Sequence, residues 1–303
     1  MIVETPHAAH AVRSHEPWRS RAVVVGLVGP AVVYILALLA PALAILLVNS
    51  VYHFTGTAVQ PILTFEAYHR FFADPYYGNV ITQEIRLAVV TTALCVVIGY
   101  PTAYAIAKIR RPVWVITAYI LIFSPLLTST IVRAYGWVII LARRGLVNWL
   151  LAQLHVTTGP VLLVYNITGV TIALVHVLLP FTVFPILSVL LRLDPALREA
   201  AADLGANRLQ AFLRVTWPLS FPGLYAAAQL TFVLAMNAYV TPQLLGGGRV
   251  QVLPLLIYQN ISDLNWPLAA VEAIALIALV WGIILSSNLL FRRSIAIAEG
   301  RSG

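Results

Sequence analysis

Six long apolar runs dominate the chain, and short polar or Gly/Pro-rich segments separate them. A helix that spans a bilayer needs about 20 predominantly apolar residues, so each run is long enough to cross with some tilt. The pattern therefore predicts an all-α, polytopic membrane protein with six transmembrane helices. The six runs are Ala22–Val48, Ile85–Ala107, Val113–Leu141, Ile167–Leu191, Leu219–Leu245 and Leu268–Phe291.

The first run has Arg19 and Arg21 before it, as a cleaved secretory signal would. The apolar core of such a signal is about 7–15 residues long, whereas Ala22–Val48 has 27 residues. We therefore expect a retained helix. The expected organisation is an N-terminal tail over 1–21, a six-span domain over 22–291 and a C-terminal tail over 292–303.

The composition agrees with a membrane protein and excludes two other classes. Hydrophobic residues make up 60% of the 303 residues and charged residues only 10%, whereas a soluble domain carries about 25% charged residues. A soluble enzyme and a disordered chain are both excluded, because the first needs more polar surface and the second fewer apolar residues. The net charge of +8 comes from short basic clusters between the runs, which is typical of membrane topology rather than of nucleic-acid binding.

The basic residues also predict the orientation, because cytoplasmic loops retain Lys and Arg. With the N-terminus inside, thirteen of the nineteen basic residues lie on the inner side, so both tails are expected in the cytoplasm. The outer segments are then His53–Glu84, Arg143–Tyr165 and the stretch 246–267. Their aromatic residues suit ordered loops at the membrane interface, and docking of a partner on them is the alternative. The inner set is Arg13, Arg19, Arg21, Lys108, Arg110, Arg111, Arg192, Arg198, Arg208, Arg214, Arg292, Arg293 and Arg301.

The inner loop Arg192–Pro218 contains strong local signals. Asp194 is a good N-cap and Pro195 suits the first helical position, which predicts a helix over Pro195–Leu204. Gly205 supplies the freedom for a C-cap or sharp turn, and Asn207 can cap a second helix over Arg208–Val215 that Pro218 ends. Small residues along this loop allow another protein to approach closely, although a solvated loop of good helix formers fits them equally well. They are Ala200, Ala201, Ala202 and Ala206.

The same loop resembles a known family pattern. Glu199-Ala200-Ala201 is followed after three residues by Gly205 and, after nine more, by Val215-Thr216-Trp217-Pro218. This spacing is similar to the EAA loop of ABC importer permeases, written E-A-A-x3-G-x9-I-x-L-P. Val215 replaces the usual Ile and Trp217 the usual Leu, and the bulk of Trp217 is expected to change how the loop packs against the membrane.

Further residues resemble the spermidine/putrescine-type permeases in particular. They are the run Asp203-Leu204-Gly205-Ala206, Pro242 and Leu245-Gly246-Gly247. The resemblance implies a permease of a bacterial inner membrane that imports a polyamine or a similar small polar solute. Some permeases of this class carry a carboxylate near the position of Asn237-Ala238-Tyr239, where this chain is neutral.

The resemblance also implies partners. The EAA loop of such importers forms a coupling helix that seats in a cytoplasmic ATPase dimer, where ATP is bound. A second permease subunit, homologous or identical, completes the pathway, and a separate extracytoplasmic protein delivers the solute. By this analogy the ATPase-coupling residues are Glu199, Ala200, Ala201, Asp203, Gly205 and Pro218.

The motifs of catalysis are missing from the sequence. A Walker A motif needs a lysine that reaches the phosphates, and the one lysine, Lys108, lies in Ala-Lys-Ile-Arg. The ATPase must therefore be another polypeptide. Gly-x-Ser-x-Gly and His-Glu-x-x-His are absent as well, so we expect no enzyme activity and no cofactor. His7, His10 and His15 lie in a polar tail, and Cys95 stands alone, so no metal site is expected.

Several polar residues fall inside the apolar runs, where ionisable groups are functional candidates by default. Arg133 and Glu272 could form the relay of a proton-coupled secondary transporter, which is the alternative function. They could instead snorkel to the interface from outer helix ends. Gln229 and Asn237 share a face of the fifth run and either line a pore or bond to neighbouring helices. His176 is expected to be packed and hydrogen-bonded. The candidate solute path comprises Gln229, Asn237, Tyr239 and Glu272.

Overall fold

The computed structural model describes residues 17–157 and 159–298 of the chain. Its contacts divide the chain into one unit up to Asn49 and a second from Ser50 onward, and each is described by itself. In the first unit, α1 (Pro17–Asn49) is one long helix. No side chain is buried along its apolar stretch Val28–Asn49. The helix predicted over the first apolar run is confirmed.

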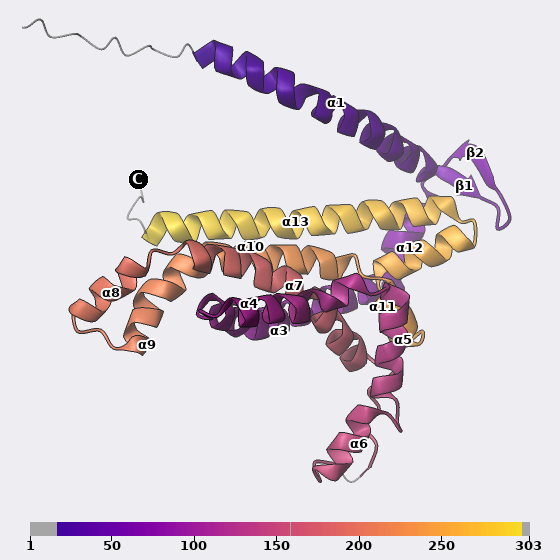
Figure 1. Cartoon of the computed structure of the whole chain (residues 1–303). Coiled ribbons are helices and arrows are strands. Elements are labelled where there is room, and N and C mark those ends of the chain that lie inside the picture. Colours follow the sequence, from indigo (N-terminus) through magenta and orange to yellow (C-terminus); the bar gives the residue numbers. More distant parts are fainter. Residues whose placement is uncertain (1–16, 158, 299–303) are drawn as a thin grey trace, which may run out of the picture. The chain divides into compact units, whose positions relative to one another are not determined.

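Three long helices form the centre of the second unit. They are α3 (Pro75–Ala107), α7 (Ile167–Arg192) and α10 (Trp217–Met236), and they pack against one another (Figure 1). Small residues let the backbones approach, as is usual between membrane helices. A Cβ on Gly223 of α10 would lie 2.7 Å from the Cγ2 of Val189 on α7. The helices therefore meet too closely at this point for a larger residue.

A further long helix, α13 (Trp266–Ala298), completes the bundle beside α10. It continues past Phe291, where the apolar pattern placed the end of the sixth span. The short helix α12 (Leu253–Ser262) packs against its first turns. Two buried hydrogen bonds tie the bundle together at different levels: Thr182 Oγ1 lies 2.7 Å from Thr231 Oγ1, and Tyr100 Oη lies 2.8 Å from Ser220 Oγ.

The third apolar run is not one straight span, contrary to the prediction. α4 (Pro112–Phe123) passes into a 3-10 turn, η1 (Ser124–Leu127), and then the chain bends by 101° into α5 (Thr130–Leu141). Pro125 has no N–H to donate within a helix, which favours a break at this point. Its carbonyl accepts a hydrogen bond from Arg133 Nη1. The side chain of Arg133 therefore satisfies a backbone group that the bend exposes.

The fifth apolar run is also broken, which corrects the continuous span predicted over Leu219–Leu245. α10 ends at Met236, and α11 (Val240–Gly246) begins after three intervening residues. Pro242 has no N–H to offer the carbonyl of Ala238, four residues before it, so an unbroken helix would lose a bond here. By length and composition, five of the described helices can cross a membrane, or six if the bent pair α4–α5 is one span.

The predicted outer segments contain short regular elements. β1 (Tyr52–Phe54) and β2 (Val59–Leu63) form an antiparallel hairpin in which His53 pairs with Gln60. It is followed by α2 (Glu66–Ala73), which packs on α13. The second outer segment contains α6 (Leu146–Gln153), and the third contains α12. α11 and α12 lie at one end of the bundle, and the loop between α7 and α10, which contains α8 (Pro195–Asp203) and α9 (Arg208–Ala211), lies at the other (Figure 1).

Candidate functional site

The loop that carries the EAA pattern begins with a well-capped helix. α8 spans Pro195–Asp203, one residue shorter than predicted. Asp194 Oδ1 accepts a hydrogen bond from the backbone N–H of Ala196 at 2.9 Å, and Pro195 occupies the first helical position. Both residues act as the sequence predicts, because the cap satisfies one of the free N–H groups of the first turn.

A sharp turn at Gly205 ends this helix. Gly205 has a φ of +84°, the left-handed conformation that only glycine adopts without strain. The N–H of Gly205 donates to the carbonyl of Ala202 at 2.9 Å, and that of Ala206 to the carbonyl of Ala201 at 3.0 Å. This pair of bonds is a Schellman motif, which fixes the direction in which the chain leaves the helix.

The second helix of the loop starts at once with its own cap. Asn207 Oδ1 accepts from the N–H of Gln210, and Gln210 Oε1 accepts from the N–H of Asn207, both at 2.9 Å. This reciprocal capping box fixes the start of α9 (Arg208–Ala211). Two helices and a rigid turn between them therefore form a defined structure rather than a flexible loop.

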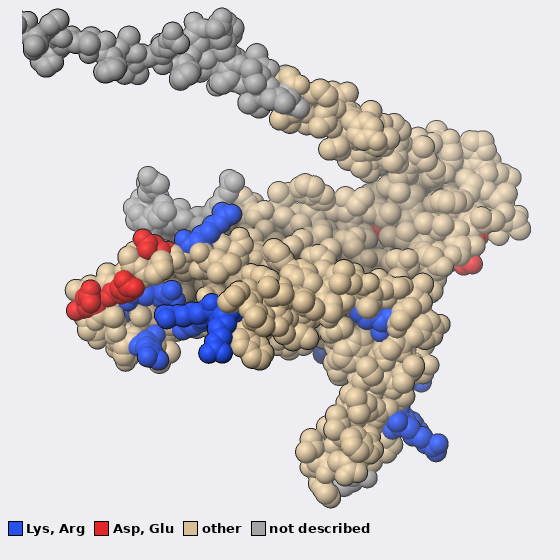
Figure 2. Space-filling model, viewed as in Figure 1, with Lys and Arg blue, Asp and Glu red and all other residues tan. Residues whose placement is uncertain are grey.

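Most of the surface of this loop is exposed, including apolar side chains. No residue of α8 is buried. Glu199, Ala200, Asp203 and Gly205 are exposed, and Ala201 is half-buried. Leu204, at the tip of the turn, exposes 89% of its surface. Charged side chains gather around α8 and α9, whereas the middle of the bundle is almost free of them (Figure 2).

The second helix does not end at Pro218, contrary to the prediction. α9 continues through a π-helical turn, η2 (Phe212–Thr216), directly into α10. In this turn the N–H of Trp217 donates to the carbonyl of Phe212, five residues earlier. The wider turn precedes Pro218, which sits in the first turn of α10, where its missing N–H costs nothing. The loop is thus joined rigidly to a bundle helix.

An aromatic cluster anchors this junction to α3. The rings of Tyr100 and Trp217 are 4.8 Å apart, and those of Tyr104 and Phe212 are 5.0 Å apart. Such pairs contribute about 0.5–1.5 kcal/mol beyond their burial. Trp217, which departs from the family pattern, therefore packs against Tyr100. The loop contacts α3 and α10 together.

The candidate path residue Gln229 is held by a polar network between α10 and α13. Its Nε2 donates to Tyr225 Oη at 2.9 Å, Ser287 Oγ at 3.1 Å and Asn288 Oδ1 at 2.9 Å. The ring of Tyr225 stacks on Phe291 at 4.0 Å. Of the two roles predicted for Gln229, the structure supports the bond to a neighbouring helix.

Asn237 and Tyr239 lie at the break between α10 and α11. Asn237 is exposed, and its Nδ2 donates to the carbonyl of Val233 at 2.8 Å. Tyr239 is 38% exposed and stacks on Tyr258 of α12 with ring centres 5.4 Å apart. These two residues, unlike Gln229, present polar and aromatic groups on the surface of the isolated chain.

Glu272 is fully buried, so it does not snorkel to an interface. Asn260 Nδ2 donates to both of its carboxylate oxygens, at 2.9 and 3.0 Å. The bond joins α13 to α12. Glu272 therefore positions α12 against α13, and the structure does not bring it to a surface with the other candidate path residues.

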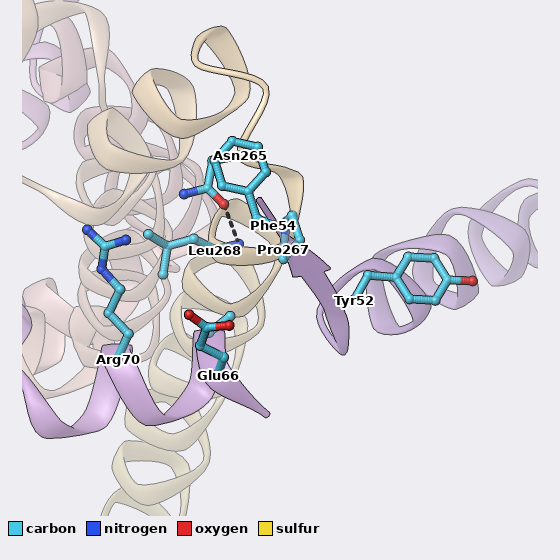
Figure 3. Close-up of a pocket in the computed structure, with 8 residues that line it drawn as sticks. Tyr52, Phe54, Glu66, Arg70, Asn265, Pro267 and Leu268 are labelled. Carbon is cyan, nitrogen blue, oxygen red and sulfur yellow. Dashed lines mark hydrogen bonds between the residues drawn. The ribbon is translucent and has the colours of Figure 1, made fainter. Parts of the chain in front are cut away.

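A small pocket opens near this region, between α2, β1 and the start of α13 (Figure 3). Glu66 and Arg70 lie one turn apart on α2, and Asn265 faces them. Asn265 Oδ1 accepts from the N–H of Leu268 at 3.4 Å. Outside the pocket, the Nδ1 of His53 lies 2.8 Å from Glu66 Oε2, which ties the hairpin to α2.

Arg133 and His176 line a cavity of about 380 Å³ at the bend of the third run. His176 is hydrogen-bonded, as predicted, because its Nδ1 accepts from Trp137 Nε1 at 3.2 Å. It is nevertheless exposed in the isolated chain rather than packed. Arg133 and Glu272 each have separate hydrogen-bond partners, so the structure gives no support to a relay between them.

The sequence pattern missed one buried carboxylate, because it began the second span at Ile85. Glu84 of α3 is 2% exposed, and its Oε2 accepts from the N–H of Leu253 at 3.2 Å, the first residue of α12. A carboxylate suits the start of a helix. Its Oε1 has no hydrogen-bond partner among the described residues. The same residues contain no group of three or more His, Cys, Asp or Glu side chains that could hold a metal.

A bundle of long apolar helices, two of its spans broken, with an exposed rigid loop at one end, defines a polytopic membrane transport protein. Residues 96–295 match the family described as "Binding-protein-dependent transport system inner membrane component", and the chain belongs to this family. It is an inner-membrane permease of a binding-protein-dependent ABC importer and not an enzyme.

Known relatives and a solved structure agree with this assignment. The chain is 36% identical to the spermidine/putrescine transport system permease protein PotB of Escherichia coli (strain K12), over 75% of this chain and 82% of that protein. For PotB of Haemophilus influenzae the identity is 33%, over 72% and 76%. The fold is similar to a chain in the crystal structure of a bacterial alginate ABC transporter in complex with an alginate pentasaccharide-bound periplasmic protein. That match has a TM-score of 0.68 and 17% identity, over 91% of this chain and 96% of the other.

Proposed function

We propose that this permease couples solute import to a separate cytoplasmic ATPase dimer through the α8–α9 loop. The observation that carries the proposal is the combination of an exposed tip with a rigid base. Leu204 is 89% exposed at the turn, while Phe212 and Trp217 fix the other end of the loop to Tyr100 and Tyr104 of α3. A movement of α8 would therefore be transmitted to α3 and α10, because no flexible segment lies between them and the loop.

Within this loop the residues have different roles. Glu199, Ala200 and Ala201 form the surface that seats in the ATPase, since the small side chains of the two alanines let its backbone approach closely. Asp203 is exposed beside them and would bind a basic group of the ATPase. Gly205 sets the angle between α8 and α9 through its φ of +84°, and Pro218 allows the wide turn that leads into α10.

The orientation follows from this role. The α8–α9 loop and both tails lie in the cytoplasm, which agrees with the basic residues of the inner segments. The hairpin, α2, α6 and α12 then lie on the outer side. An extracytoplasmic solute-binding protein docks there, and a second permease subunit, homologous or identical, completes the path across the membrane.

The solute is a polyamine or a similar small polar molecule, as the names of the relatives suggest. Asn237 and Tyr239, at the break after α10, are the candidate path residues with exposed groups. An aromatic face such as that of Tyr239 attracts an organic ammonium group. Gln229 and Glu272 stabilise the helices that form the path, because their side chains are hydrogen-bonded to α13 and α12 respectively.

The experiment is the Gly205→Val variant in the assembled transporter, with solute-stimulated ATP hydrolysis as the measurement. A β-branched residue at this φ costs about 1–3 kcal/mol and would change the turn. Stimulation should be abolished while insertion and assembly persist. Gly56→Val is the matched control, since Gly56 also has a positive φ, +89°, and open space around it, but lies in the outer hairpin. Normal stimulation in Gly205→Val would refute the coupling role.

A further inference from the structure

A polar stripe runs along the first turns of α3. Asn79, Thr82, Gln83 and Arg86 are spaced three, four and seven residues from the first, so they share one helix face. They line a cavity of about 510 Å³ together with Tyr165, Asn166 and Arg249. The lining residues come from the first turns of α3, the start of α7 and the segment between α11 and α12, and these last two helices lie at the opposite end of the bundle from the α8–α9 loop (Figure 1).

The cavity contains two arginines and no acidic residue. Arg86 and Arg249 are both exposed, and their side chains make no hydrogen bond or ion pair with any residue between 17 and 298 that the structure describes. Glu84 is the nearest carboxylate in sequence to Arg86, but it is buried and bound to the N–H of Leu253. The positive charge in the cavity is therefore not neutralised from within the chain.

One wall of the cavity is held in a strained conformation. Tyr165 has a φ of +61°, which is costly for a residue with a side chain. Its N–H donates to the carbonyl of Leu245 at 2.7 Å, and its ring occupies the space over Gly247, where a Cβ would come within 2.2 Å. The glycine turn that accommodates Tyr165 also places Arg249, two residues later. The wall and the backbone of Arg249 are thus fixed by neighbouring contacts.

This arrangement suits a carboxylate and not a cationic solute. Guanidinium groups bind carboxylates through paired hydrogen bonds, and the amides of Asn79 and Gln83, which have no partner within the described residues, offer further donors. A polyamine would be repelled by both arginines. The cavity is therefore distinct from the candidate path at Asn237 and Tyr239.

We propose that the Arg86–Arg249 cavity receives an acidic side chain of the extracytoplasmic solute-binding protein. This inference rests on the proposed function, which places this end of the bundle outside. The family depends on a binding protein, and the alginate transporter with a similar fold was solved in complex with its periplasmic protein. Charge complementarity of this kind fixes the register of docking and raises the rate of encounter.

The test measures binding of the solute-loaded binding protein to the assembled transporter in nanodiscs, at low and high salt. The double variant Arg86→Glu/Arg249→Glu should bind at least about tenfold more weakly, and its affinity should fall less steeply with salt than that of the wild type. Basal ATP hydrolysis without binding protein should not change. Arg144→Glu is the matched control, because Arg144 is an exposed outer arginine that does not line the cavity.

Two further variants keep the test decisive. Arg86→Gln/Arg249→Gln removes the charge without reversing it and should cause a smaller loss, even if the Glu pair assembles poorly. An acidic-to-basic change on the binding protein should restore docking to the Glu pair.

Unchanged affinity and salt dependence in both double variants would overturn the proposal. Lost uptake with unchanged docking would also overturn it and would place the cavity in the solute path. Failure of the wild-type transporter to bind any binding protein would instead refute the proposed function.

Discussion

The two ends of the bundle are built in different ways. At the α8–α9 end, helices start and stop at local signals, and the turn between them is fixed by bonds within the loop, while only its junction with α10 depends on the distant Tyr100 and Tyr104. Asp194, Gly205 and Asn207 each make their bonds within four residues. At the opposite end, α5, α11 and α12 depend on contacts between segments that are far apart in sequence, such as Glu84 with Leu253.

This difference suits two different mechanical tasks. A loop that transmits force to a partner needs a fixed internal shape, and local capping provides it. In the proposed function the opposite end faces outward and has to open and close, which requires contacts that can be exchanged. Two of its helices, α5 and α11, follow interruptions of a membrane helix. The backbone N–H and C=O groups freed at such an interruption are tolerated in a membrane only where they face protein or a water-filled cavity.

The largest effect among the variants that probe this comparison is expected for Trp217→Ala. The change removes the ring that packs on Tyr100 at 4.8 Å and loosens the base of the loop. Coupling between ATP hydrolysis and the bundle should fall by about 2- to 30-fold, the range that 0.5–2 kcal/mol corresponds to. Solute-stimulated ATP hydrolysis is the measurement. Trp281→Ala on the exposed face of α13 is the control, and equal losses in both would argue against a specific role of the aromatic cluster.

A smaller effect on coupling is expected for Glu84→Leu, at the opposite end of the bundle, because this change acts on the stability of the fold. The N–H of Leu253 would lose its acceptor in a buried place, which costs about 1–3 kcal/mol of stability. Each kcal/mol lowers the melting temperature by about 2–4 °C. Glu84→Gln keeps an acceptor oxygen and should be closer to the wild type. Asp263→Leu, at an exposed position directly after α12, should leave the melting temperature unchanged. If Glu84→Leu melts like the wild type, the bond to α12 is not structural.

The smallest effect is expected for Glu272→Gln. In the wild type, Asn260 Nδ2 donates to both carboxylate oxygens of Glu272. In the variant, the amide oxygen of the glutamine can still accept from Asn260. Uptake should remain close to that of the wild type at every pH. A loss of uptake that depends on pH would contradict the positioning role and revive the proton-coupled mechanism.

The structural part of the α8–α9 loop was predictable from sequence, because each signal there acts over a few residues. Asp194 caps α8, Gly205 adopts a positive φ and Asn207 caps α9, as expected. The error in this loop concerned Pro218. A proline normally interrupts a helix, but the π-helical turn before it absorbs the missing bond, and no simple pattern predicts such a turn.

The outer end was less predictable for a related reason. Apolar runs look alike whether a helix is continuous or broken, so the bends after Pro125 and before Pro242 were missed, although the prolines themselves were a usable signal. The start of α3 was placed ten residues late, at Ile85 instead of Pro75, because the polar residues from Asn79 to Glu84 resemble a loop. Because this segment resembles a loop, the sequence predicted neither the buried Glu84 nor the cavity with Arg86 and Arg249.

The most direct test of the central claim uses cysteine labelling of Leu204. The single native cysteine, Cys95, is fully buried, so Leu204→Cys provides one reactive thiol at a position 89% exposed. Leu63→Cys, 76% exposed in the outer hairpin, is the matched control. A membrane-impermeant maleimide should label Leu204→Cys only from the cytoplasmic face, and addition of the ATPase should protect it, while Leu63→Cys is labelled only from outside and is not protected. Labelling of Leu204→Cys from outside, or an unchanged rate with the ATPase bound, would contradict the account.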